Sequence, residues 1–205
     1  MSEIVAGHYA RHAAALKAEL AAAIPRATLR ELHRRQPWRH LAVAARQYLL
    51  LAAGMAVLVA GPHWAVWIPV AWLQGFTVFN FTVLLHEVVH HAVFVRRRPL
   101  AERLLGLAYA VPSGLSATQF TRWHLDHHAE LGSADADPKR HWLSPRTNAR
   151  WYKLLYATPA LFAIYFRAAR QESASYPAAV RRRIAWERRL SVAVHLAVAG
   201  AIWWG

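Results

Sequence analysis

The sequence has 205 residues, of which 56% are apolar, with a mean hydropathy of +0.13 and a formal charge of +14. It contains no cysteine, which excludes disulfides and thiolate ligands, so any bound metal must be held by nitrogen and oxygen. The basic residues stand in blocks beside apolar stretches, as the positive-inside rule of membrane proteins describes, and we therefore expect no nucleic acid among the partners.

The N-terminal part of the chain is polar and predicts short helices at the membrane surface. Residues 8–24 are rich in alanine and predict one helix, which Pro25 ends. Thr28 followed by Glu31 matches a capping box and predicts a second short helix.

A membrane hairpin is predicted next. Residues 47–85 contain no Asp, Glu, Lys or Arg, whereas a membrane helix needs only about 20 uncharged residues. We expect crossings over about 41–60 and over 64–85, joined by a turn at Gly61-Pro62-His63. The turn carries no Lys or Arg, while the segments before and after the hairpin are rich in them. Both ends of the hairpin are therefore expected on the cytoplasmic side.

The rest of the chain alternates basic and apolar segments. Residues 96–150 are polar and basic, with a helix that opens near Ser116 and is closed by Gly132. The apolar segment 154–166 is too short to cross a bilayer and is expected at its interface. The final apolar run, 190–205, would reach only about 24 Å, which resembles a crossing cut short.

The expected fold is therefore all-α: an integral membrane helical hairpin with a cytoplasmic helical cap, ending in an incomplete second membrane hairpin. Residues 1–40 are assigned to cytoplasmic or interfacial helices, and residues 41–205 to one membrane domain. We expect the natural protein to continue past Gly205, or its gene to be truncated.

Six of the thirteen histidines fall into two short groups, which are His86, His90 and His91, and His124, His127 and His128. On a helix, residues four apart share a face, so His86 and His90 can point at one ion. The spacing of the second group places its three rings on one side of a helix. Six imidazoles exceed the needs of one tetrahedral zinc and suit two ions, so we expect both groups to converge on a dinuclear iron centre that activates dioxygen.

Three further side chains are candidates around such a site. Glu87 and Asp126 are expected to accept hydrogen bonds that orient ligating imidazoles, although Asp126 equally suits a position facing water. His195 lies inside the last apolar run and is either a functional group or a hydrogen-bonded helix residue. The stretch from His86 to His90 also matches the H-E-x-x-H motif of zinc metalloproteases, an alternative that leaves the second group unexplained.

The pattern HEVVHH at the end of a membrane hairpin, then RWHLDHH, Gly132 and the acidic pair Asp135 and Asp137, resembles the membrane fatty acid desaturase family. The similarity is greatest to the branch with sphingolipid Δ4-desaturases and related bacterial acyl-chain desaturases, and covers about residues 41–169. It implies two non-haem iron ions, dioxygen as co-substrate and removal of two hydrogens from a fatty acyl or sphingoid chain. The ligands that it implies are His86, His90, His124, His127 and His128, with His91 as a sixth.

The same resemblance implies an acyl-chain lipid substrate and an electron donor such as a cytochrome b5 or ferredoxin at a cytoplasmic active-site face. The sequence lacks the third H-x-x-H-H box of the family. Three alternatives therefore stay open: a lipid or hydrocarbon hydroxylase with the same chemistry, the zinc protease, and an inactive fragment or metal-binding membrane scaffold.

Overall fold

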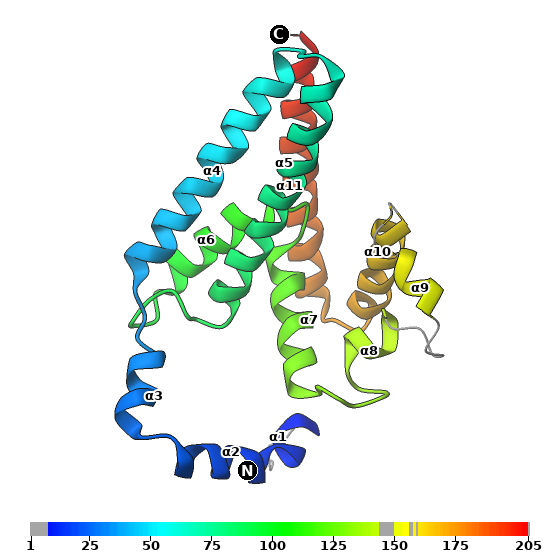
Figure 1. Ribbon diagram of the computed structural model, residues 1–205. Helices are drawn as coiled ribbons and strands as arrows, with labels where there is room; N and C mark the ends of the chain where they lie inside the picture. Colours follow the sequence, from blue (N-terminus) through cyan, green and yellow to red (C-terminus); the bar gives the residue numbers. More distant parts are fainter. Residues whose placement is uncertain (1–7, 144–149, 156–157, 159, 205) are drawn as a thin grey trace. The chain divides into compact units, whose positions relative to one another are not determined.

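The computed structural model describes residues 8–143, 150–155, 158 and 160–204 (Figure 1). Within these residues the regular structure is helical and contains no strand, which confirms the expected all-α fold. The helices are α1 (His8–His12), α2 (Ala14–Ala23), α3 (Arg26–Leu32), α4 (Pro37–Val59), α5 (Trp64–Val89), α6 (Pro99–Ala110), α7 (Ala117–Ala129), α8 (Pro138–Trp142), α9 (Arg150–Leu154), α10 (Ala160–Ala174) and α11 (Ala178–Trp204). The chain forms two compact units: unit 1 consists of Met1–His33 and Gln119–Arg182, and unit 2 of Arg34–Thr118 and Arg183–Gly205.

Helices α4 and α5 form the hairpin of unit 2 and are in contact with each other (Figure 1). Gly61 closes the turn between them with a φ of 61°, in the left-handed region that favours glycine. Gly54 permits the close approach of the two helices, because a Cβ there would collide with the side chain of Gln74. The Gln74 amide uses this space to donate a hydrogen bond to the carbonyl of Leu50 at 3.0 Å.

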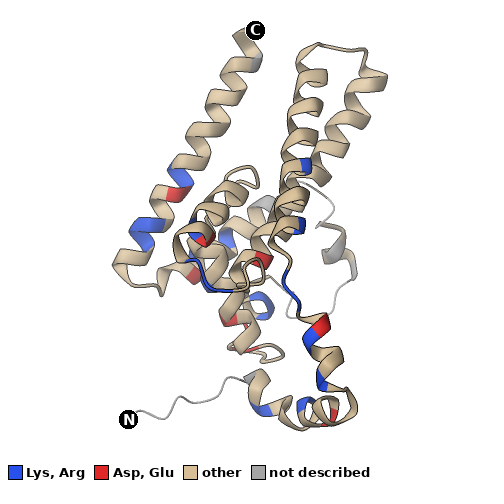
Figure 2. Cartoon of the chain, turned by 90° about the vertical axis from the view of Figure 1, so that its left-hand side faces the viewer, with Lys and Arg blue, Asp and Glu red and all other residues tan. Residues whose placement is uncertain are grey.

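Two helical stretches, Arg26–Val59 and Trp64–Val89, are long and apolar enough to cross a membrane. They confirm the expected membrane hairpin, with α4 starting at Pro37 and α5 continuing as far as Val89. Figure 2 shows that the half of this hairpin next to its turn is free of charged side chains, while Lys and Arg gather towards the other end. The separation follows from the cost of placing a charge in hydrocarbon.

Helix α6 covers the last turns of α5. Phe81, Leu85 and Tyr109 are almost completely buried there, and the rings of Phe81 and Tyr109 lie 6.4 Å apart. The segment between the two helices is held by Arg35, just before α4, whose guanidinium donates to the carbonyl of Phe94 at 2.9 Å. These contacts fix the backbone on both sides of the first histidine group.

The first turn of α7 is held to α11 by the buried carboxylate of Glu187. This group accepts hydrogen bonds from the hydroxyls of Ser116 and Thr118, both at 2.6 Å, and from the Thr118 backbone N–H at 2.8 Å. An anion at a helix N-terminus is also favoured by the helix dipole. Glu187 therefore fixes the start of the helix that carries the second histidine group.

Unit 1 has a small core of its own. Trp123 of α7 packs with Ala168 and Ala169 of α10, and Trp142 and Tyr165 cover this cluster. The Gln119 amide donates to the Ala169 carbonyl at 2.7 Å. This core joins α7, α8 and α10, and it fixes which side of α7 faces away from Trp123.

Some predicted boundaries differ from the structure. The helix expected to open at Thr28 begins at Arg26, and its N-cap Pro25 makes no capping hydrogen bond, so the capping-box prediction was wrong. Proline presets the backbone for a helical start without such a bond. The predicted interfacial segment 154–166 includes residues 156, 157 and 159, which lie outside the described residues. The domain boundary near residue 40 stays a prediction.

Candidate metal centre

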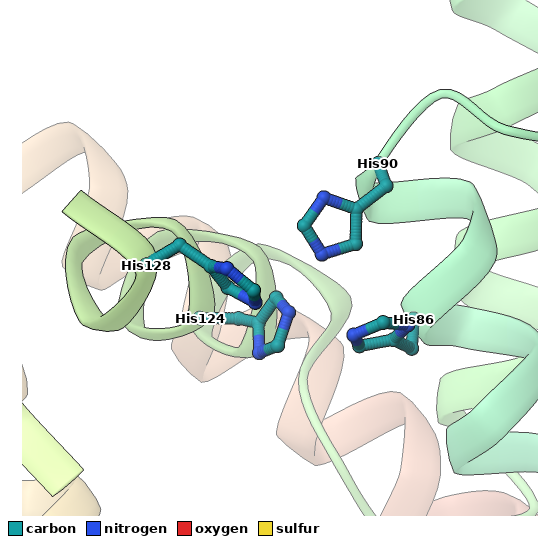
Figure 3. Close-up of side chains that lie close together, drawn as sticks. All are labelled: His86, His90, His124 and His128. Atoms are coloured by element: carbon teal, nitrogen blue, oxygen red, sulfur yellow. The ribbon is translucent and has the colours of Figure 1, made fainter. Parts of the chain in front are cut away.

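His86 and His90 stand one turn apart at the end of α5. Their ring centroids lie 4.6 Å apart, and both rings project from the same side of the helix (Figure 3). This is the spacing that residues four apart on a helix produce. The structure therefore brings together the first pair of predicted ligands.

His91 lies beyond the end of this helix, in a left-handed conformation with a φ of 52°. Its N–H bonds to the Val88 carbonyl at 3.0 Å, and the Ala92 N–H bonds to the Glu87 carbonyl at 2.9 Å. Together the two bonds form a Schellman motif, which usually places glycine at this position. The backbone turns away at His91, so this side chain does not continue the face of His86 and His90.

The ring of His91 lies between Glu102 and Arg97. Its Nδ1 is 2.8 Å from a Glu102 carboxylate oxygen, and its Nε2 is 2.5 Å from the Arg97 guanidinium. A carboxylate only accepts and a guanidinium only donates, so these contacts assign the proton to Nδ1 and the lone pair to Nε2. The part of His91 in metal binding stays a prediction.

The second group lies on one side of α7. The rings of His124 and His128 are 4.5 Å apart, and His127 lies 5.7 Å from His128 (Figure 3 for His124 and His128). The Phe120 ring stacks on His124 with an interplanar angle of 4°. The predicted sharing of a helix face is present within this group.

His127 has a carboxylate partner that the sequence did not identify. Its Nδ1 lies 2.7 Å from Oδ1 of Asp137, and the Asp137 residue is only 3% exposed. Asp137 is ten residues away in the sequence and also caps α8. The sequence pointed to Asp137 only as a member of the acidic pair that follows the second histidine group.

The two carboxylates predicted to orient ligating imidazoles have other partners. Glu87 accepts a hydrogen bond from Nδ1 of His40 at 2.6 Å, and Nε2 of His40 lies 3.0 Å from the Tyr109 hydroxyl. Burial raises the pKa of Tyr109 to about 12, with Tyr48 and Glu87 adding to the rise, so its hydroxyl keeps its proton. His40 is buried, and as a single histidine it gave no sequence signal.

Asp126 faces Arg122, one turn earlier on α7, with Nε and Oδ2 3.3 Å apart. Burial raises the pKa of Asp126, while Arg122 opposes this rise and Glu130 adds to it. The contact is a helix-surface ion pair, which agrees with the alternative that Asp126 faces water rather than a ligand.

Unit 2 contains an apolar cavity of about 1170 Å³ between α4, α6 and the second half of α11. Tyr48 and His195 contribute its polar side-chain atoms. The Tyr48 hydroxyl donates to the Ala108 carbonyl at 2.6 Å, and Nδ1 of His195 lies 2.7 Å from the Ser191 carbonyl. His195 thus makes the backbone contact expected of a helix-interior histidine, and a role for it as a ligand stays a prediction.

These donors fit iron. Imidazole is a good ligand for iron. The described residues offer a pair of histidines at the end of α5 and a group of three on α7, and His91 lies just beyond the end of α5. A ligating imidazole usually donates its other N–H to a carboxylate or carbonyl, as His127 does to Asp137.

Comparison with known proteins agrees with this chemistry. The fatty acid desaturase family matches residues 62–205, a range that includes both histidine groups. The sphingolipid delta(4)-desaturases DES1 of Homo sapiens and Xenopus tropicalis are each 32% identical to the chain over 59 residues, or 28% of this chain. The aligned part spans only 18% of the length of these curated relatives. No solved structure matches the chain.

Proposed function

Since the chain belongs to the fatty acid desaturase family, we propose that it is a membrane-bound diiron oxidoreductase that introduces a double bond into a fatty acyl or sphingoid chain. The observation that carries the proposal is the pairing of ligand rings on two helices, 4.6 Å apart in one pair and 4.5 Å in the other. Both pairs lie within the range that matches the family.

We assign the iron ligands to the two groups jointly, namely His86, His90, His91, His124, His127 and His128. Support comes from the helix spacing of His86 with His90 and of His124 with His128, and from the carboxylate behind His127.

The proposed substrate is the hydrocarbon chain of a lipid. The apolar cavity of unit 2, of about 1170 Å³, supports an apolar ligand, because the Tyr48 hydroxyl and one nitrogen of His195 are already hydrogen-bonded. The two relatives are sphingolipid desaturases by name, which favours a long chain as the reacting group. A lipid held this way would enter from the bilayer beside the hairpin.

When bound, the two irons supply the oxidising chemistry, in which dioxygen takes two electrons and two protons from the chain and two of each from outside, and leaves as two waters. The residues of this protein hold the metals and position the methylenes. We place the active-site face in the cytoplasm, because Arg96, Arg97 and Arg98 follow the first histidine group after four residues. The same arginines suit an acidic electron donor such as a cytochrome b5 or a ferredoxin.

A hydroxylase acting on a lipid chain uses the same centre and is the nearest alternative. The zinc protease needs Glu87 as a general base, yet one oxygen of this carboxylate already accepts a hydrogen bond from His40. An inactive fragment would need no metal at all.

The test is metal analysis of the chain purified in lipid nanodiscs after loading with ferrous iron under anaerobic conditions. We expect about two irons per chain, and about none in His86→Gln or His128→Gln. His63→Gln is the matched control, because His63 lies at the other end of α5, in the turn of the hairpin. One zinc that survives iron loading would favour the protease, and no metal would favour the inactive fragment; either result contradicts the proposal.

A further inference from the structure

In unit 1, the carboxylate of Asp137 is hydrogen-bonded to His127, a predicted metal ligand. Oδ1 of Asp137 lies 2.7 Å from Nδ1 of His127, and the side chains of Asp137 and His127 are 4% and 18% exposed. We propose that Asp137 is a positioning residue, which fixes the His127 ring so that Nε2 is the nitrogen offered to iron. The inference rests on the proposed function, since it assumes that His127 binds metal.

The chemistry of the contact determines which nitrogen is free. A carboxylate accepts hydrogen bonds, so Nδ1 of His127 carries the proton and Nε2 keeps its lone pair. Ligating histidines commonly have such an acceptor behind them, which orients the ring and raises the basicity of the ligand nitrogen. A histidine without this support divides its population between two tautomers and several ring orientations.

The carboxylate is itself fixed before any metal arrives. Oδ1 of Asp137 also accepts hydrogen bonds from the backbone N–H groups of Lys139 and Arg140, at 2.9 and 3.3 Å. The Arg140 guanidinium donates to the Gly132 carbonyl at 2.9 Å and ties the two ends of this loop together. Because the acceptor has little freedom left, it restricts the ring of His127 rather than following it.

The other acidic side chains nearby do not offer the same support. Asp126, one residue before His127, faces Arg122 at 3.3 Å. Asp135 is exposed, two residues before Asp137. Among the carboxylates described in unit 1, Asp137 is the one that combines burial with a short contact to a predicted ligand.

A purely structural role for Asp137 would be the capping of α8, and one substitution separates the two roles. Serine is as good a helix N-cap as aspartate, but its side chain is shorter and carries no charge. Asp137→Ser should therefore keep the cap of α8 and lose the acceptor of His127. Asp135→Ser makes the same change at the exposed neighbour and is the matched control.

The experiment measures ferrous iron affinity by competition with a chelator for the wild type, Asp137→Ser, Asp135→Ser, His127→Gln and the double variant His127→Gln/Asp137→Ser. We expect Asp137→Ser to weaken binding about 10–100-fold. Asp135→Ser should bind as the wild type does. In the His127→Gln background the Asp137 change should add almost nothing, because a residue that acts through His127 has no effect once that ring is gone.

A second measurement is independent of metal. Nitrogen-15 NMR of the metal-free chain, labelled at histidine, should show His127 as the Nδ1–H tautomer in the wild type and as a mixture in Asp137→Ser. Equal iron affinity of wild type and Asp137→Ser, or equal losses in both His127 backgrounds, would overturn the role of Asp137 alone. A wild-type chain that binds no iron would overturn the proposed function together with it.

Discussion

His40 donates a hydrogen bond from Nδ1 to the carboxylate of Glu87 at 2.6 Å, and this bond joins α4 to the last turn of α5. Nε2 of His40 then accepts from the Tyr109 hydroxyl of α6 at 3.0 Å. One buried imidazole thus links three helices just beside His86 and His90. Glu87 thereby helps to hold the hairpin together, and its role beside a ligating imidazole stays a prediction.

Replacing His40 by Phe should lower the free energy of unfolding by about 1–3 kcal/mol, because the Tyr109 hydroxyl and the Glu87 carboxylate both lose a partner. Thermal unfolding in detergent measures the change. His33→Phe, at an exposed histidine, should leave the midpoint where it is. Glu87→Gln should lower stability but retain iron; a variant of normal stability without iron would place Glu87 in the chemistry after all.

Removing the metal should destabilise the protein. A metal that binds only the folded chain adds about 2.7 kcal/mol when its free concentration is one hundred times its Kd. We expect a chelator to lower the midpoint of thermal unfolding and ferrous iron to restore it. The shift should disappear in His124→Gln and persist in His63→Gln. If iron does not change the midpoint of thermal unfolding of the wild type, the metal does not stabilise the fold and this prediction is wrong.

Gly54→Ala should weaken the hairpin. Its Cβ would displace the Gln74 amide, which donates to the Leu50 carbonyl at 3.0 Å. Interhelical hydrogen bonds of this kind contribute about 0.6 to 1.7 kcal/mol in membrane proteins, so we expect a loss of that size. Gly75→Ala is the control within the same hairpin, because its Cβ would meet no atom within 4 Å. Equal effects of the two substitutions would contradict the close approach at Gly54.

Glu187→Ala should cost about 3 kcal/mol, because it leaves the buried hydroxyl of Ser116 and the partly buried donors of Thr118 without their acceptor. Glu187→Gln should cost less, since an amide oxygen still accepts. Chemical unfolding measures both, with Glu31→Ala as the control at an exposed glutamate. Iron affinity should fall along with stability, because Glu187 anchors the start of the helix that carries His124.

The sequence alone was sufficient wherever the physical cause is local. An uncharged stretch over residues 47–85 must be accommodated by a membrane, and a turn at Gly61 divides it into the two helices that the structure contains. The pairing of His86 with His90, and of His124 with His128, follows in the same way from 3.6 residues per helical turn. Such features need no knowledge of distant parts of the chain.

The tertiary structure decided which carboxylate supports which imidazole. The partner of Glu87 is His40, 47 residues away, and the partner of His127 is Asp137, across a loop closed by Arg140. From the sequence we expected Glu87 and Asp126 to orient ligating imidazoles, a role that stays a prediction for both. His91 lies outside the helix face that His86 and His90 share, because the Schellman motif at the end of α5 redirects the backbone at that residue. Hydrogen-bond partners of buried imidazoles depend on how helices pack, and packing is a property of the whole fold.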